Sequence, residues 1–165
     1  MHPAQPRNRR MIPATPTLQT VSEFPIVGLS VRTDNACEFN PFTAKLPALW
    51  QELHQQAWVK PSHAGLYGVY SDYESDVNGA YTVTAGIALS DHPSPESSLA
   101  RITVPQGSYL VFTSQGVMPQ AIIHAWQSVW AYFAANPGHR RTYRVDFEHY
   151  SGPLDCAVYI GVQDA

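Results

Sequence analysis

The chain contains an internal repeat, and this repeat limits its fold more than any other feature. Residues 67–73 (YGVYSDY) resemble residues 143–150 (YRVDFEHY), and residues 85–87 (AGI) resemble residues 160–162 (IGV). Both pairs are separated by about 75 residues, a period that suggests duplication of a supersecondary unit. We therefore predict two halves with the same architecture, with chance similarity between aromatic-rich hairpins as the alternative.

The first half reads as a strand, a helix and two further strands. Apolar residues at helical spacing follow Asn40, a favoured residue at a helix N-terminus, and Pro47 predicts a kink or a short first turn. Pro25 indicates an edge or a bulge in the first strand. The Asn-Gly pair at 78–79 is a strong hairpin signal. The expected ranges are 18–31 for the first strand, 40–60 for the helix, and 66–73 and 80–89 for the hairpin.

The second half repeats this order after a proline-bearing turn at residues 92–95. Its helix has one apolar side, and we assign Trp130 on that side to the core. The expected ranges are 100–104 and 107–113 for a broken strand, 119–135 for the helix, and 143–150 and 156–162 for the last two strands.

These patterns predict an α+β fold in which duplicated strand-helix-strand-strand modules form one domain. The two halves of this domain cover residues 17–90 and 97–165. Residues 1–16 are rich in proline, arginine and glutamine, and we expect them to be a flexible lead-in.

The charge and motif content exclude several functions. A net charge of −3 gives no basic footprint for nucleic acid. No apolar run approaches the roughly 20 residues that a membrane helix needs, and no secretory segment is present. We therefore expect a cytoplasmic protein in which Cys37 and Cys156 are reduced thiols. The histidines lack metal-ligand spacing and no glycine-rich phosphate loop follows a strand, so no metal or cofactor is expected.

Glu148 is the residue that ordinary folding explains least well. Strand alternation places Val145 and Phe147 on one face, and Asp146, Glu148 and Tyr150 on the other. A carboxylate buried among aromatic rings is costly, because ring faces offer it no hydrogen bonds. A solvated strand position is the ordinary interpretation, and a positively charged ligand is the functional one.

Four segments, in a fixed order, carry a family resemblance. They are 73–76 (YESD) leading into 79–86 (GAYTVTAG), 105–112 (PQGSYLVF), the helix with Trp126 and Trp130, and 146–150 (DFEHY). Together they resemble the gyrase-inhibitor-like family, the effector-binding domains that follow the DNA-binding regions of AraC-type and MerR-type activators. The resemblance covers roughly residues 17–163. It is closer to stand-alone members carried on integron gene cassettes.

The resemblance implies one curved antiparallel sheet with a ligand cleft between the two modules. Family members bind bulky lipophilic cations there, and the glutamate of the Asp-Phe-Glu motif, here Glu148, lies on the cleft floor. Aromatic walls would add cation–π attraction of about 0.5–2 kcal/mol per ring. For each aromatic candidate, ordinary packing is the alternative. The candidate ligand-binding residues are Glu148, Tyr159, Tyr81, Trp126, Trp50, Phe112, Tyr70 and Tyr109.

Asp146 shares the face of Glu148. It is expected either as a second counter-charge or as the partner of a nearby arginine, Arg141 or Arg144.

The leading functional hypothesis is a protein that captures lipophilic cationic drugs or dyes. It either buffers them or acts as the sensing half of a regulator assembled in trans with a protein partner. One alternative is a small-molecule hydrolase with Glu148 as general base, although no second polar group is evident. Another is a protein-partner role such as gyrase inhibition, for which a net charge of −3 is too mild to mimic DNA.

Overall fold

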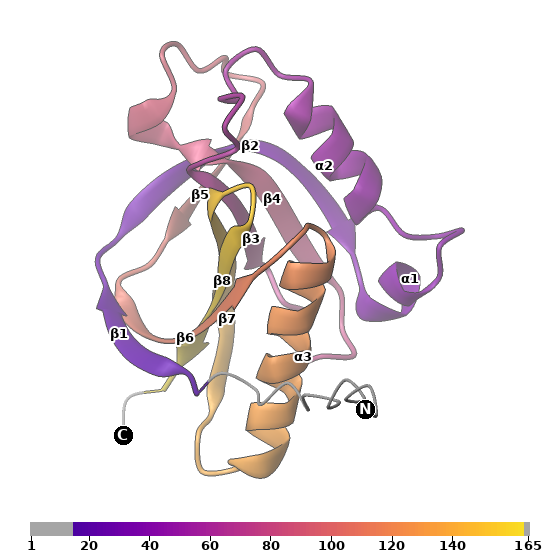
Figure 1. Ribbon diagram of the computed structural model, residues 1–165, viewed down its shortest axis with the longest axis vertical. Coiled ribbons are helices and arrows are strands. Elements are labelled where there is room, and N and C mark those ends of the chain that lie inside the picture. Colours follow the sequence, from indigo (N-terminus) through magenta and orange to yellow (C-terminus); the bar gives the residue numbers. More distant parts are fainter. Residues whose placement is uncertain (1–14, 164–165) are drawn as a thin grey trace, which may run out of the picture.

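The computed structural model describes residues 15–163, which form one curved antiparallel sheet and its covering helices (Figure 1). The elements are β1 (Thr17–Val21), β2 (Phe24–Thr33), α1 (Asn35–Phe39), α2 (Leu46–His54), β3 (Leu66–Ser71), β4 (Tyr81–Ala88), β5 (Ala100–Val104), β6 (Gly107–Gln115), α3 (Gln120–Ala135), β7 (Arg141–Gly152) and β8 (Asp155–Val162). The sheet runs in the order β1-β6-β8-β7-β3-β4-β2-β5. The predicted α+β fold is confirmed.

The two halves have the same order and meet at the centre of the sheet. The first half is β2-α2-β3-β4, the second is β6-α3-β7-β8, and β3 pairs with β7 between them. The short strand that precedes each half crosses over, because β1 pairs with β6 and β5 pairs with β2. The sheet of each half is therefore extended by the short strand that precedes the other half.

The predicted strand at 18–31 is two strands rather than one. Its parts are β1, an end strand of the sheet, and β2, which lies next to the end strand on the opposite side. Pro25 pairs with Thr103 of β5, but the pairing of β2 with β4 begins only at Ile26. Because β4 does not pair with residue 25, the N–H group that proline lacks costs no hydrogen bond to β4. Pro25 therefore occupies a local edge position, as the sequence indicated.

The first long helix does not begin at Asn40 as predicted. Asn40 is the C-cap of α1, and α2 begins only at Leu46. The carboxylate of Glu38 accepts the backbone N–H groups of Lys45 and Leu46 at 3.0–3.2 Å, which caps α2 from outside. Pro47 lies in the first turn, where a missing N–H is tolerated.

Aromatic rings fill the face of the sheet opposite the helices. Phe147 stacks on Tyr159 with ring centroids 4.3 Å apart, and its edge contacts with Tyr109 and Phe24 measure 5.4 Å and 5.7 Å. The helix-covered face has two further apolar clusters, one under α2 and one under α3. Trp126 packs against both clusters, which locates the junction of the halves beside β3 and β7.

Two further sequence expectations concern residues 1–16 and membrane-spanning helices. The predicted flexible lead-in, residues 1–16, lies almost wholly outside the described residues. Within residues 15–163, none of the helices has the length and apolar character needed to cross a membrane.

Candidate functional site

A cavity of about 710 Å³ lies between α2 and α3, above the central strands β3 and β7. This volume falls within the range of small-molecule sites, about 300–1,000 Å³. Its lining is mainly apolar and aromatic, and includes Trp50 from α2, Trp126 and Trp130 from α3, and Tyr70 from β3. Glu148 of β7 is part of this lining.

Glu148 is held at the bottom of the cavity by three neutral donors. The indole N–H of Trp126 and the hydroxyl of Tyr70 donate to Oε2 at 2.7 Å and 3.1 Å. The hydroxyl of Tyr150 donates to Oε1 at 2.9 Å. The side chain is 4% exposed, and no described cationic side chain forms an ion pair with it. Its oxygens are thus hydrogen-bonded while its charge has no opposite charge beside it.

Burial and hydrogen bonding act on Glu148 in opposite directions. Burial raises the pKa of the carboxyl above its usual value, and the bonds from Trp126, Tyr150 and Tyr70 lower it without cancelling that rise. Burial and the neighbouring carboxylate also raise the phenol pKa of Tyr70 and of Tyr150 well above the usual value. Both hydroxyls therefore stay protonated and remain donors at neutral pH.

The aromatic residues supply polar atoms, which the sequence argument overlooked. Ring faces offer a carboxylate no hydrogen bonds, but the hydroxyls and the indole N–H lie at the ring edges and donate to Glu148. Tyr150 was not among the candidate residues. Its signal was its place two residues beyond Glu148 in β7, on the same face of the strand.

Gly68 allows Trp50 to lie against Glu148. Gly68 faces Glu148 across the β3–β7 pair. A Cβ atom at this glycine would stand 2.8 Å from Oε1 of Glu148 and 2.9 Å from Cζ2 of Trp50. The Trp50 ring also makes an edge contact with Tyr150 at 5.2 Å, and Tyr70 contacts Trp126 at 5.1 Å. Four aromatic rings therefore surround the carboxylate.

Five of the candidate residues lie together around the cavity, and three do not. The cavity is lined by Glu148, Tyr70, Tyr81, Trp50 and Trp126.

Tyr159 and Tyr109 pack on the opposite face of the sheet, where the register pairs Tyr159 directly with Phe147. Phe112 is on the helix side but is 1% exposed beneath α3, against Tyr132. None of these three residues forms a wall of the cleft.

Trp130 is not in the core, in contrast to the prediction. It is 41% exposed, lines the cavity and makes an edge contact with Phe39 of α1 at 6.1 Å. The inward side of α3 is formed by smaller residues, among them Ala125 and Val129, which are 1% and 0% exposed. This rotation of the helix turns Trp130 toward the mouth of the cavity.

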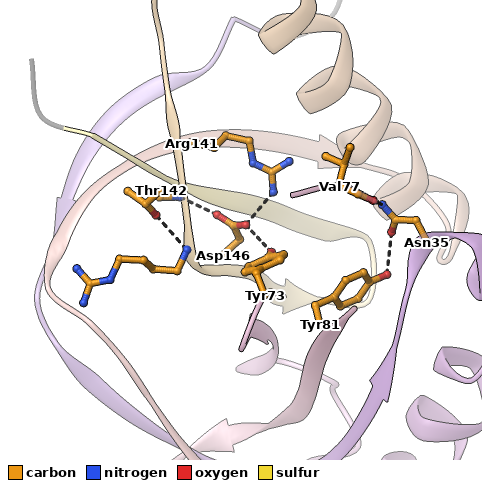
Figure 2. Close-up of polar contacts among 9 residues, drawn as sticks. Asn35, Tyr73, Val77, Tyr81, Arg141, Thr142 and Asp146 are labelled. Carbon is orange, nitrogen blue, oxygen red and sulfur yellow. Dashed lines mark hydrogen bonds and ion pairs between the residues drawn. The ribbon is translucent and has the colours of Figure 1, made fainter. Parts of the chain in front are cut away.

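Asp146 is a second buried carboxylate, but its charge is matched. It accepts hydrogen bonds from Arg141 at 2.8 Å, from the hydroxyl of Tyr73 at 2.5 Å and from the backbone N–H of Gly161 at 2.9 Å (Figure 2). The guanidinium of Arg141 also lies 4.4 Å from the ring centre of Tyr143. Of the two roles expected for Asp146, the structure shows the ion pair with a nearby arginine, which is Arg141.

No group of three or more His, Cys, Asp or Glu side chains within the described part of the chain is placed to hold a metal ion.

Comparison with known proteins identifies the family. The model of the Cass2 family, described as integron-associated effector binding protein, matches residues 17–162. This chain belongs to that family. The resemblance to integron-carried effector-binding proteins is thereby confirmed.

Individual relatives agree with this assignment. An integron cassette protein from the mobile metagenome of Vibrio cholerae is 36% identical, with a TM-score of 0.81 over 91% of this chain and 97% of that one. YobU of Bacillus subtilis, described as a candidate transcriptional regulator, is 32% identical over 129 residues, which are 74% of this chain and 78% of that protein. The structure of SAV2435 bound to tetraphenylphosphonium shares the fold at 19% identity, with a TM-score of 0.66 over 90% of this chain and 93% of that one.

Proposed function

We propose that this effector-binding protein captures bulky lipophilic cations, such as drugs or dyes, in the cavity between α2 and α3. The observation that carries the proposal is the state of Glu148. It is 4% exposed, its three hydrogen bonds come from neutral groups, and it opens onto a cavity of about 710 Å³. A cation in this cavity supplies the opposite charge that the described residues do not.

The hydrogen bonds of Glu148 also determine which cations fit. Because three donors already serve the carboxylate, the ligand does not need an N–H group to satisfy it. Quaternary ammonium, phosphonium and large aromatic cations with dispersed charge are therefore suitable. The rings of Trp50, Trp126 and Tyr70 add dispersion and cation–π attraction of about 0.5–2 kcal/mol each. Selectivity follows charge and size more than exact shape.

The relatives support this ligand class and a regulatory role. SAV2435 has the same fold and was solved with tetraphenylphosphonium, a quaternary phosphonium of the kind that suits Glu148. The family is described as effector-binding, and YobU as a candidate transcriptional regulator. Both descriptions support a role as the ligand-sensing component of a regulator in which a partner protein provides contact with DNA.

The hydrolase alternative receives less support from the site. A hydrolase would need a second polar group aimed at the reacting atoms. The described polar groups that contact Glu148 are the hydroxyls of Tyr70 and Tyr150 and the indole N–H of Trp126, and all three are engaged with its carboxylate. This arrangement favours holding a charge over activating water.

A thermal-shift panel tests the proposed function. Lipophilic cations and neutral compounds of matched size are added to the wild type, to Glu148→Gln and to the control Glu52→Gln, which removes an exposed carboxylate outside the cavity lining. A ligand at 100 times its Kd should add about 2.7 kcal/mol of stability, or roughly 5–11 °C for a chain of this length.

We expect these shifts with cations in the wild type and the control, and much smaller ones in Glu148→Gln. Equal shifts in all three proteins, or none from any cation, would refute the proposal.

A further inference from the structure

The cavity has a second acidic end, away from its floor. Glu38 of α1 and Asp76 of the β3–β4 loop line it there, together with Asn35. Among the described lining residues, Arg141 is the single arginine or lysine, and Asp146 engages it in an ion pair at 2.8 Å. The acidic end therefore has no neutralising lysine or arginine within the described lining.

Glu38 is fixed in position rather than free to move as a surface side chain. Its carboxylate accepts the backbone N–H groups of Lys45 and Leu46 at 3.0–3.2 Å and the hydroxyl of Thr33 at 2.5 Å. The side chain is half-buried. Like Glu148, it is held by neutral donors and forms no ion pair within the described residues. It is a preorganised negative charge at the cavity wall.

Two tyrosine rings connect the two carboxylates along the cavity. The hydroxyl of Tyr70 donates to Glu148, and its ring lies 5.4 Å from that of Tyr81. The hydroxyl of Tyr81 donates to Asn35 Oδ1 at 2.8 Å (Figure 2), and Asn35 lies one helical turn before Glu38 in α1. Burial is the main cause that raises the phenol pKa of Tyr81, and Glu38 and Glu148 both contribute to this rise. Tyr81 is thus linked to Tyr70 on the Glu148 side by a ring contact and to Asn35 of α1 by its hydroxyl.

We propose that the cavity is adapted to dications, elongated compounds with two positive centres joined by an apolar linker. One centre is placed at Glu148 and the other at Glu38, with Asp76 nearby, while the linker lies along the Tyr70 and Tyr81 rings. This inference rests on the proposed function and specifies its ligand class. A single cation satisfies only one of the two preorganised carboxylates, whereas a dication of the right length satisfies both.

Isothermal titration calorimetry with bisquinolinium compounds tests the inference. In these compounds two quinolinium groups are joined by a linker of three to ten methylenes. Each compound is compared with an N-alkylquinolinium whose alkyl chain has the same length. The proteins are the wild type, Glu38→Gln, Glu148→Gln and the control Glu52→Gln. Glutamine at position 38 keeps an acceptor for the N–H groups of α2, so the helix cap is retained.

We expect the best-fitting dication to bind the wild type about tenfold more tightly than its single-charge counterpart, equivalent to about 1.4 kcal/mol. Glu38→Gln should remove most of this advantage, because it weakens the dication more than the single cation, whose positive centre lies at Glu148. Glu148→Gln should weaken both ligands. The inference is overturned if single and double cations bind within about twofold at every linker length, since two equal ends alone give a twofold statistical gain. It is also overturned if Glu38→Gln weakens both ligands equally. Binding of neither ligand would instead refute the proposed function itself.

Discussion

The two buried carboxylates of β7 should respond in opposite ways to loss of charge. Asp146 and Glu148 are 0% and 4% exposed and lie on the same face of the strand. Asp146 neutralises Arg141, whose side chain is 8% exposed, whereas Glu148 is held by neutral donors. We therefore predict that Asp146→Asn is strongly destabilising and that Glu148→Gln is not.

The magnitude for Asp146→Asn follows from the charge that it leaves behind. Breaking a buried ion pair by changing one partner costs about 3–5 kcal/mol, because the other charge stays buried and unpaired. For a chain of this length, each kcal/mol lowers Tm by about 2–4 °C, so the expected loss is roughly 6–20 °C. Asparagine can still accept the N–H of Gly161, which Asp146 bonds at 2.9 Å, so the change removes chiefly the ion pair.

Glu148→Gln leaves no opposite charge behind. The amide oxygen can accept the two bonds now made to Oε2, and the amide nitrogen can donate to the hydroxyl of Tyr150. We expect the stability of the ligand-free protein to change by less than about 1 kcal/mol at neutral pH, in favour of the glutamine variant.

The pH dependence has a definite sign. Burial raises the folded-state pKa of Glu148 above the unfolded value of 4.5. The stabilisation from protonated Glu148 is complete below that unfolded value and is lost as the pH rises through the folded-state pKa. The advantage of the glutamine variant should therefore vanish in acid and be largest at neutral pH.

Urea denaturation of both variants at several pH values is the assay. A similar loss of stability in the two variants at neutral pH would refute the reasoning, since it would make Glu148 a structural carboxylate like Asp146.

Two further substitutions test the arrangement of the aromatic rings around Glu148. Gly68→Ala places a Cβ atom 2.9 Å from the Trp50 ring, so we expect cation affinity measured by tryptophan fluorescence to fall by about tenfold, and unchanged affinity would contradict the geometry. Trp126→Phe removes a hydrogen bond that lowers the pKa of Glu148, so that pKa should rise. Carbon NMR of the carboxyl group measures this change, and a pKa that stays the same or falls would argue against the bond.

The sequence was informative where the signal was local. Strand alternation correctly placed Glu148 and Asp146 on one face of β7, and helical periodicity placed Trp50 and Trp126 on the apolar sides of their helices. The internal repeat predicted two equivalent halves, and the resemblance to a known family supplied the cleft between them. For alternation, periodicity and the repeat, the deciding residues lie within one element or in its repeat, whereas the resemblance rests on four segments along the chain.

Register and rotation are the properties that the sequence did not specify. Alternation within β8 separates its two faces, but pairing of Tyr159 with Phe147 decides which face is which. The side of α3 that carries Trp130 depends in the same way on how the helix rests on the sheet. The start of α2 depends on Glu38, which lies outside that helix. These outcomes are set by contacts between elements, and a single sequence does not show them.

The most direct test of a charge-selective cavity uses two ligands of the same shape and opposite charge. Tetraphenylphosphonium and tetraphenylborate are titrated calorimetrically into the wild type, Glu148→Gln and Glu52→Gln at neutral pH. We predict that the phosphonium binds the wild type and the control, that it binds Glu148→Gln at least about tenfold more weakly, and that the borate binds none of them measurably. Equal phosphonium affinity in the wild type and Glu148→Gln, or binding of the borate by the wild type, would contradict the account.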